Sequence, residues 1–596
     1  MRIDRVGYAV LAAIVGGVCY INSLGNGFVF DDPAYIGHRV IRQFALGDIF
    51  LQRWLQLELY RPLTLLSLAS DFRFYGEAPG GYHLTNLLLH AVNCALFYLF
   101  GAQVLGKGPA ALWAALFYAV HPLQSDVVNW VAARGDLLMQ LFLLVGLLCH
   151  SRGGRWWGKI AWFCCAASLL SKENGILMPV LAWWYDFCLG EGRGIGWGRY
   201  IWTWGQRHFA YGIVVVVVLG WRLTVGAEGE GPESTNFLAA VELHQRLMTI
   251  VSIFMHYLVL MAFPLRLSAD YSNASIPVVA TALDPWFIGG IVGVCVLGYL
   301  LWRVPRGNIS FAAGWFWASL LPVSNLFFLP PSAMAERYLY LALIPLALVF
   351  GLAVNACLER WMPPWRYVGT GLALLVLLGY AGRTVWRNGD WRSDGTLFAA
   401  VLAHYPDNVR AHENLGGALF RRGRLQEARA HYQRAIAINP SNVRSFYNLG
   451  LLHDQLRQYE AAIQAYQAAL RLQPQHTDSH YGLGLVLQKT GRYQAAVPHY
   501  REVLEQMPDH FGAAYNLARA YQRLERHQAA LQQFAVALEL NPQAAKIYYY
   551  LGGLYRQMGR QTEMVQAWKT LLRLAPNHAE AGKIRPLLED YTRQEE

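Results

Sequence analysis

The chain has 596 residues, of which 55% are hydrophobic and only 15% are charged, against roughly 25% charged residues in typical soluble domains. This composition excludes a single soluble globular domain, and the length allows more than one domain. The net charge of +11 lies largely in short loops between apolar segments. That is the positive-inside pattern of membrane proteins rather than the basic face of a nucleic-acid-binding protein, so no nucleic acid partner is expected.

Apolar segments of about membrane-spanning length follow one another through residues 1–390. The first segment follows Arg2 and Arg5 without a convincing cleavage site, so we interpret it as an uncleaved membrane helix. The segments are 6–22, 82–104, 109–121, 136–150, 159–170, 175–189, 209–225, 247–264, 286–302, 309–329, 338–356 and 367–385.

Clusters of Lys and Arg between these segments predict which loops are cytoplasmic. If all of these Lys and Arg clusters are cytoplasmic, the first outer loop 23–81 is external, and so are the stretches on both sides of 247–264. We therefore expect 247–264 to be a re-entrant or interfacial helix, with its backbone covered by protein. Eleven crossings remain, and an odd number places the C-terminal region outside with the 23–81 loop. The clusters are Arg2/Arg5, Lys107, Arg152/Arg155/Lys159, Arg193/Arg199/Arg207, Arg303/Arg306 and Arg360/Arg366.

Two side-chain types stand at the outer ends of these helices, where charges are costly and commonly functional. Asp31 and Asp32 open the first outer loop; a carboxylate there could accept the proton of a hydroxyl group, and the pair could hold a divalent cation. Alternatively, an Asp before Pro33 caps a helix. We expect Asp31 to be the base and Asp32 to be the cap.

Cationic side chains at the same ends predict a phosphate site, because a fixed cation binds a phosphate anion. We assign this role to Arg134, Lys172 and Arg337. Equally, Lys172/Glu173 and Glu336/Arg337 could be structural ion pairs between helix ends. The supporting members of the set are Tyr60, Arg61, His121, Asp126, Asp136, Glu173 and Glu336.

Proline recurs every 34 residues in the C-terminal third, which is the period of tetratricopeptide (TPR) repeats. The prolines are Pro406, Pro440, Pro474, Pro508, Pro542 and Pro576. In each period a small residue on the first helix should face an aromatic on the second, as in Gly450 and Tyr466. The fold prediction is therefore all-α, with a transmembrane domain (1–390) before a TPR α-solenoid (391–596).

Within the solenoid we expect an entering helix (391–405), full repeats (407–576) and a closing helix (577–596). TPR arrays bind polypeptides, so an exported polypeptide is the expected partner. The groove-facing position carries asparagines that could bind a peptide backbone, although Asn is also simply common there. These are Asn414, Asn448 and Asn516.

Six short motifs occur in a fixed order along the transmembrane part. They are FDD at Phe30–Asp32, YRPLT at Tyr60–Thr64, HPLQSDVVNWVAARGD at His121–Asp136, SKENG at Ser171–Gly175, LSADYS at Leu267–Ser272 and AERYLYL at Ala335–Leu341. Together with the TPR tail, this order resembles the transmembrane-and-TPR O-mannosyltransferases (the TMTC family) and their bacterial relatives in the GT-C glycosyltransferase superfamily.

The resemblance implies an enzyme that takes a sugar from a polyprenyl phosphate, dolichyl in eukaryotes and usually undecaprenyl in bacteria. It implies transfer of that sugar, mannose in the named family, to Ser or Thr of an exported protein held by the TPR repeats. It places the catalytic acids at Asp31 and Asp32, which are also the residues for any divalent metal. We expect a multi-pass protein of a bacterial inner membrane, with the repeats in the periplasm.

Two other functions fit the same sequence. One is a GT-C enzyme that glycosylates a lipid or a cell-envelope glycan and uses the repeats for assembly. The other is a non-catalytic membrane scaffold. Deleting the repeats distinguishes a protein acceptor from a lipid acceptor, and replacing Asp31 and Asp32 distinguishes enzyme from scaffold.

The charge pattern predicts that the first outer loop and the end of the repeats lie on the same side of the membrane. Single cysteines placed at Gly80 and Glu596 should both react with an impermeant thiol reagent from outside the cell. A cytoplasmic label at Arg360 is the matched control. If Glu596 reacts only after the membrane is permeabilised, eleven crossings is the wrong number.

Overall fold

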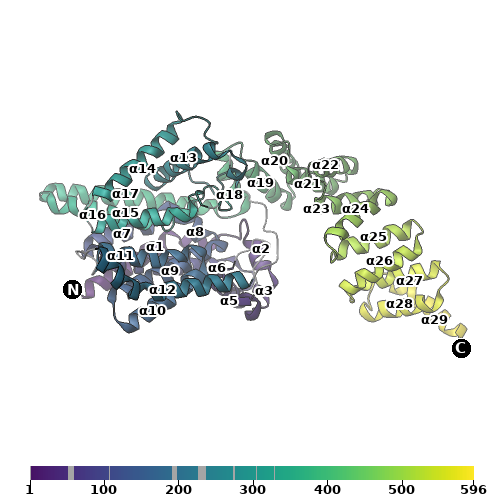
Figure 1. The fold of residues 1–596 in the computed structure, drawn as a ribbon. Helices are drawn as coiled ribbons and strands as arrows, with labels where there is room; N and C mark the ends of the chain where they lie inside the picture. Colours follow the sequence, from purple (N-terminus) through teal and green to yellow (C-terminus); the bar gives the residue numbers. More distant parts are fainter. Residues whose placement is uncertain are drawn as a thin grey trace. The chain divides into compact units, whose positions relative to one another are not determined.

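A computed structural model describes residues 2–51, 60–106, 108–190, 197–225, 236–272, 275–303, 305, 307–327 and 329–595. Every element in these residues is a helix, which confirms the all-α prediction (Figure 1). The chain divides into two compact units, Met1–Ala411 and His412–Glu596. This division falls later than the predicted boundary at residue 390, because α18 (Asp394–His404) packs Leu397 against Val29 and Trp391 of the first unit.

Each of the twelve apolar segments predicted in the first unit overlaps an α-helix, although the predicted segment 309–329 continues past the end of its helix at Leu320. These are α1 (Arg2–Cys19), α6 (Pro79–Leu105), α7 (Gly108–Val120), α9 (Arg134–Arg152), α10 (Arg155–Ser171), α11 (Leu177–Cys188), α12 (Trp197–Thr224), α13 (Leu243–Ala262), α14 (Pro285–Arg303), α15 (Asn308–Leu320), α16 (Leu343–Arg360) and α17 (Pro363–Asp390). Six stretches of the described residues are long and apolar enough to cross a membrane. They are Arg5–Gly25, Pro79–Leu105, Val131–Arg152, Leu243–Ala262, Leu343–Arg360 and Pro364–Asp390. The eleven crossings stay a prediction.

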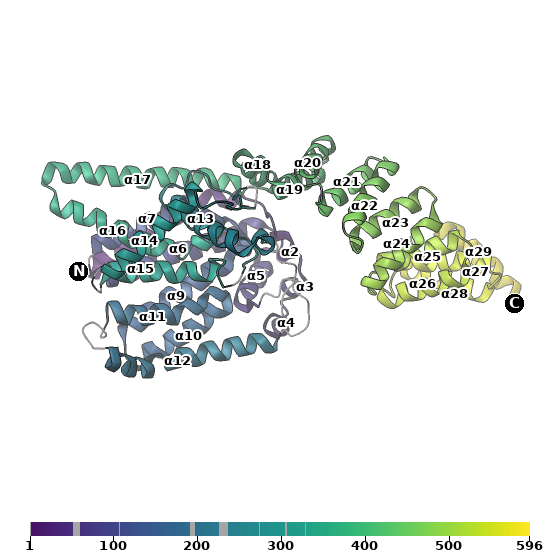
Figure 2. The same cartoon turned by 45° about the horizontal axis from the view of Figure 1, so that its top comes forward.

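Small residues let these helices pack closely, as in membrane bundles. A Cβ at Gly351 on α16 would lie 2.2 Å from the carbonyl oxygen of Ala110 on α7, so only glycine fits at this crossing. Beside it, the rings of Phe117 and Phe350 stack at 4.5 Å. The helices α9, α10, α11 and α12 lie side by side in the same unit (Figure 2).

Helix α13 is the segment that the charge pattern predicts to be re-entrant or interfacial. Just before its start, the Asn236 amide donates to the side chain of Asn325 at 2.8 Å and to the carbonyl of Pro330 at 2.9 Å. Near its end, His121 donates from Nε2 to the carbonyl of Met261 at 3.1 Å. By length and composition Leu243–Ala262 is also able to cross a membrane, so the re-entrant or interfacial placement of α13 stays a prediction.

Short helices gather around the outer loops and carry most of the predicted site residues. In the first loop, Ile36, Ile41 and Leu68 are buried in one small apolar cluster, which orders the chain there. These elements are α2 (Asp32–Gly37), α3 (Arg39–Arg42), α4 (Leu46–Leu51), α5 (Pro62–Tyr75), η3 (Pro122–Gln124), α8 (Ser125–Asn129), η4 (Val131–Ala133), η5 (Glu173–Ile176) and η8 (Glu336–Leu339).

The repeat region consists of five helix pairs and a last helix, as predicted (Figure 1). A Cβ at Gly450 would lie 2.6 Å from the ring of Tyr466, which confirms the predicted packing of a small residue against an aromatic. The helices are α19 (Val409–Arg421), α20 (Leu425–Ile438), α21 (Val443–Gln455), α22 (Tyr459–Leu472), α23 (Thr477–Lys489), α24 (Tyr493–Gln506), α25 (Phe511–Arg523), α26 (His527–Leu540), α27 (Ala545–Gln557), α28 (Gln561–Leu574) and α29 (Ala581–Glu595).

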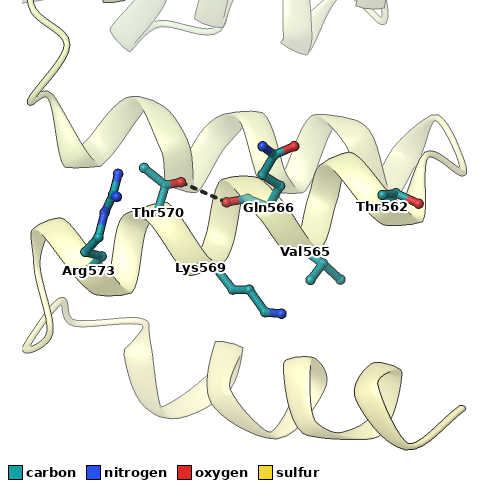
Figure 3. A pocket seen from close by; sticks show the side chains of 6 residues that line it. All are labelled: Thr562, Val565, Gln566, Lys569, Thr570 and Arg573. Atoms are coloured by element: carbon teal, nitrogen blue, oxygen red, sulfur yellow. Dashed lines mark hydrogen bonds between the residues drawn. The ribbon is translucent and has the colours of Figure 1, made fainter. Parts of the chain in front are cut away.

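The repeat unit also has a cavity of about 420 Å³ along α28 (Figure 3). Its lining side chains all come from this one helix and include Lys569 and Arg573. None of the lining residues is a site residue predicted from the sequence. The candidate chemistry therefore lies in the first unit.

Candidate active site

The loop before α2 is held in a strained conformation at Phe30, whose φ of 57° is rare for a residue with a side chain. Three contacts fix it. The Phe30 N–H donates to the Asp394 carboxylate at 2.8 Å. The ring stacks on Phe398, with centroids 5.7 Å apart, and meets Trp130 edge-on at 5.4 Å. Strain of this kind persists only where the surroundings enforce it, and it often marks a functional site.

The two adjacent carboxylates that follow Phe30 differ in their exposure to solvent. Asp32 is fully buried, and its two oxygens accept the backbone N–H of Val29 at 3.1 Å and of Ala132 at 2.8 Å. Asp31 is exposed at the start of α2. The two carboxylates therefore diverge, with one inside the protein and one at its surface.

The predicted role of Asp32 as a helix cap is wrong in detail. Helix α2 begins at Asp32 itself, and Asp31 occupies the capping position without a side-chain hydrogen bond to the helix. Asp32 instead ties its own loop to η4. Each Asp32 oxygen accepts one N–H and keeps a second lone pair, so a divalent cation held jointly by Asp31 and Asp32 stays a prediction.

Arg337, a predicted phosphate ligand, lies within electrostatic reach of the exposed Asp31, and Lys172, another predicted ligand, lies within reach of Arg337. The Lys172 ammonium pairs with Asp136 at 2.5 Å. The Arg337 guanidinium lies over the ring of Trp130 at 5.1 Å, and its backbone N–H donates to Asp126 at 2.9 Å. Burial would lower the pKa of Arg337, but the neighbouring groups Tyr338, Asp126, Asp136 and Asp31 together raise it above its ordinary value.

A third cation, Arg61, lies within electrostatic reach of Lys172. It donates to both oxygens of Glu173, at 2.8 Å from Nη2 and 3.1 Å from Nε. Arg222 of α12 approaches the same carboxylate at 3.3 Å. Burial would raise the pKa of Glu173, but these two guanidinium groups lower it to about 2. Glu173 therefore stays ionised at neutral pH and fixes both arginines.

The ion-pair cluster contains four cations, Arg61, Lys172, Arg222 and Arg337, and three carboxylates paired with them, Asp126, Asp136 and Glu173. With Asp31, four carboxylates stand against four cations. What these cations offer a phosphodiester anion is therefore a fixed position rather than an excess of charge.

Arg134, the remaining predicted phosphate ligand, does not belong to this set. It is fully buried and pairs with Asp71 at 2.6 Å, and it also donates to Asn86 at 2.8 Å and to the carbonyl of Tyr82 at 2.9 Å. A guanidinium held by so many partners inside the protein has a structural role. The phosphate assignment of Arg134 is therefore wrong, because the sequence does not show which way a charged helix end points.

Three supporting residues also have structural contacts. His121 accepts the N–H of Leu123 and donates to α13, as described above. Glu336 is fully buried and accepts from the backbone of Ser268 and from the Tyr271 hydroxyl, which holds the LSADYS motif. The Tyr60 hydroxyl donates to Phe50 and accepts from Trp221 at 3.0 Å.

Sequence reasoning missed four residues of the candidate site. Tyr35 is buried within electrostatic reach of Asp31 and Arg61. Trp130 lies between Phe30 and Arg337, and Arg222 reaches Glu173 from α12. Asp394 holds the strained residue from α18. Only Trp130 and Tyr35 carry a sequence signal, since both stand inside or beside the quoted motifs; the other two come from distant helices.

The predicted peptide-groove asparagines differ in the repeat unit. Asn414 and Asn448 are partly exposed on the first helices of their repeats. Asn516 is 8% exposed, and its amide donates to the Tyr481 hydroxyl at 3.2 Å and to the carbonyl of Gly512 at 2.8 Å. It therefore does not suit the role of a donor to a bound peptide.

Comparison with known families identifies the repeats. The tetratricopeptide repeat profile matches residues 381–443, 447–511 and 515–579, and a second profile of the same repeat matches 487–536. Among solved structures, the TPR protein YrrB is 22% identical and aligns with 32% of this chain and 97% of its own, at a TM-score of 0.30.

Similar curated proteins extend beyond the repeats. Protein O-mannosyl-transferase Tmtc3 of Drosophila melanogaster is 25% identical over 497 residues, covering 70% of this chain and 54% of that protein. Protein O-mannosyl-transferase F38B6.6 of Caenorhabditis elegans is 26% identical over 435 residues, covering 70% and 60%. Protein O-mannosyl-transferase TMTC4 of Homo sapiens is 26% identical over 488 residues, covering 70% and 64%. The chain thus spans between half and two thirds of the length of these relatives.

Asp32 gives the site a pH-dependent stability. Burial raises its pKa from 3.8 to about 8, against the opposing effect of the Val29 and Ala132 N–H groups. Between these values the folded chain holds a proton that the unfolded chain releases, so this group makes stability fall as the pH rises. Asp32→Asn abolishes the titration and turns an amide N–H₂ toward a backbone N–H, at a cost of about 1–3 kcal/mol.

The melting temperature of the wild-type chain should therefore exceed that of Asp32→Asn by more at about pH 5 than at about pH 9. Thermal unfolding of both purified proteins over this range measures the difference. A difference that stays constant with pH would show that Asp32 does not titrate in the folded state.

Proposed function

We propose that this chain, a relative of the TMTC-type protein O-mannosyltransferases, is a membrane glycosyltransferase. It moves a sugar, mannose by analogy with those relatives, from a polyprenyl phosphate to a Ser or Thr hydroxyl of an exported polypeptide. One observation carries this proposal: the exposed carboxylate of Asp31 stands on a strained loop beside a cluster of fixed cations.

In the proposed reaction, the acceptor oxygen forms a bond to the anomeric carbon of the sugar while the bond from that carbon to the phosphate oxygen breaks. The hydroxyl proton passes to Asp31. A positioned carboxylate of this kind contributes on the order of 10²–10⁴ in rate. Asp32 does not take the proton directly, because it is buried and both its oxygens face backbone N–H groups.

The leaving polyprenyl phosphate gains negative charge as the bond breaks, and Lys172 and Arg337 stabilise that charge. Their carboxylate partners hold them in place before the reaction begins, so little reorganisation is needed. Arg61 is held more tightly by Glu173 and positions η5, which follows Lys172 directly.

The repeat unit supplies the polypeptide acceptor in this proposal. Asn414 and Asn448 are the groove residues that remain available to contact an extended peptide backbone. For the acceptor to be an exported protein, the repeats and the Asp31 loop share the extracytoplasmic side of a bacterial inner membrane, as the charge pattern predicts.

Replacing the base tests the reaction directly. Asp31→Asn should lower transfer by about 10²–10⁴ without lowering the melting temperature, since Asp31 is exposed. Intact-mass glycoproteomics of exported proteins, from cells expressing each variant in place of the wild type, measures transfer. Asp48→Asn is the matched control: it lies in the same loop and pairs with Arg39 at 3.7 Å, outside the cluster. Wild-type glycosylation with Asp31→Asn would refute this mechanism.

Removing a phosphate ligand should weaken use of the donor. Arg337→Gln, and the charge-neutral double variant Lys172→Gln/Asp136→Asn, should each lower kcat/KM for the polyprenyl-phosphate sugar by about 10²–10³. The double variant avoids leaving a buried carboxylate unpaired. Arg366→Gln, an exposed cation on α17 outside the cluster, is the control. Unchanged kinetics in both cluster variants would place the phosphate elsewhere.

A further inference from the structure

A second polar cluster lies in the first unit, away from the candidate active site. His150 comes from the last turn of α9, Asp186 from α11 and His208 from α12. All three side chains are buried, at 5%, 6% and 6% exposure. One nitrogen of each imidazole and one carboxylate oxygen lie within 4.8 Å of one another. The proposed transfer reaction uses none of these residues.

Two of the three spacings among these atoms are close to those between ligands of a zinc ion. His150 Nε2 lies 3.2 Å from Asp186 Oδ2, and His208 Nε2 lies 3.0 Å from the same oxygen. In a tetrahedral zinc site with bonds of about 2.0–2.1 Å, neighbouring ligand atoms are about 3.3 Å apart. The three side chains could therefore close on an ion with only small movements.

The surroundings supply two further features of a metal site. The other nitrogen of His150, Nδ1, is 3.1 Å from the Tyr211 hydroxyl, and an outer hydrogen bond of this kind orients a ligating imidazole. His150 and Tyr211 also line a cavity of about 280 Å³ that extends along Gly153, Gly154 and Arg155. Of the three proposed ligands, His150 is the one that this cavity reaches.

We propose that His150, Asp186 and His208 bind a zinc ion. Two imidazoles and a carboxylate are ligands that zinc accepts, and its charge would compensate the Asp186 carboxylate, which is otherwise costly to bury. Sulfur ligands are absent from the set, which disfavours a soft metal such as Cu(I).

The ion would join three helices, and one of them reaches the candidate active site. Helix α12 carries His208 and, about 20 Å further along its axis, Trp221 and Arg222. These two residues contact Tyr60 and Glu173. Zinc would thus anchor the helix that supplies them, while lying too far away to take part in the transfer itself.

Metal analysis of the full-length chain, purified in detergent and stripped with a chelator before titration with zinc chloride, tests the proposal. The wild type should take up one zinc per chain, and its melting temperature should rise on binding. The double variant His150→Ala/His208→Ala should lose that equivalent. The matched control His480→Ala/His499→Ala removes two partly buried histidines, whose Nδ1 atoms lie 2.9 Å apart in the repeat unit, and should keep it.

Two single variants add to the test. Tyr211→Phe should weaken zinc affinity by about 10–100-fold while keeping the stoichiometry. Asp186→Asn keeps the shape of the side chain and should lower affinity further. The proposal is overturned if the wild type binds no zinc and shows no melting shift, or if the double variant binds as the wild type does. It is also overturned if the control loses the equivalent instead. The wild-type measurements decide even where a variant does not fold.

Discussion

The carboxylate of Asp32 accepts one backbone N–H from its own loop and another from Ala132, and the arrangement of the candidate site follows from this pair of bonds. With Asp32 turned inward, its neighbour Asp31 must face outward. The same bonds hold the first outer loop against η4, which leads directly into the turn that carries Asp136. Because Asp136 positions Lys172, one buried side chain links the proposed base to a proposed phosphate ligand.

The ion pairs at these helix ends are better explained as a means of orienting charged side chains than as a source of folding stability. Removing charges from water at such depth costs about as much as their attraction returns, so buried pairs rarely add net stability. What they provide is fixed direction: Lys172 and Arg337 are held by carboxylates before any donor arrives. Arg134 is also paired with a carboxylate, but its partners enclose the guanidinium completely. It therefore has only a structural role.

Helix α12 connects the two polar clusters of the membrane unit. Its His208 belongs to the proposed zinc site, and its Arg222 belongs to the ion pairs around Glu173. Apart from these clusters, the helix has many apolar side chains exposed, among them Val216, Val217 and Leu223, as expected for a helix that faces lipid. In lipid, such a helix has little hydrophobic driving force for packing, so polar contacts at its ends have a large part in fixing its position.

The sequence by itself determined the class of the fold, because periodic proline, the pairing of Gly450 with Tyr466 and long apolar segments are local patterns. It also predicted that the charged helix ends share one side of the membrane, which is a statement about side and not about contact. It did not determine which of those charges face the site. Arg134 and Arg337 look alike in the sequence, and only packing encloses the first and leaves the second beside Asp31. Asp394 and the cluster of His150, Asp186 and His208 depended wholly on tertiary structure, because their members are brought together from helices far apart in the chain.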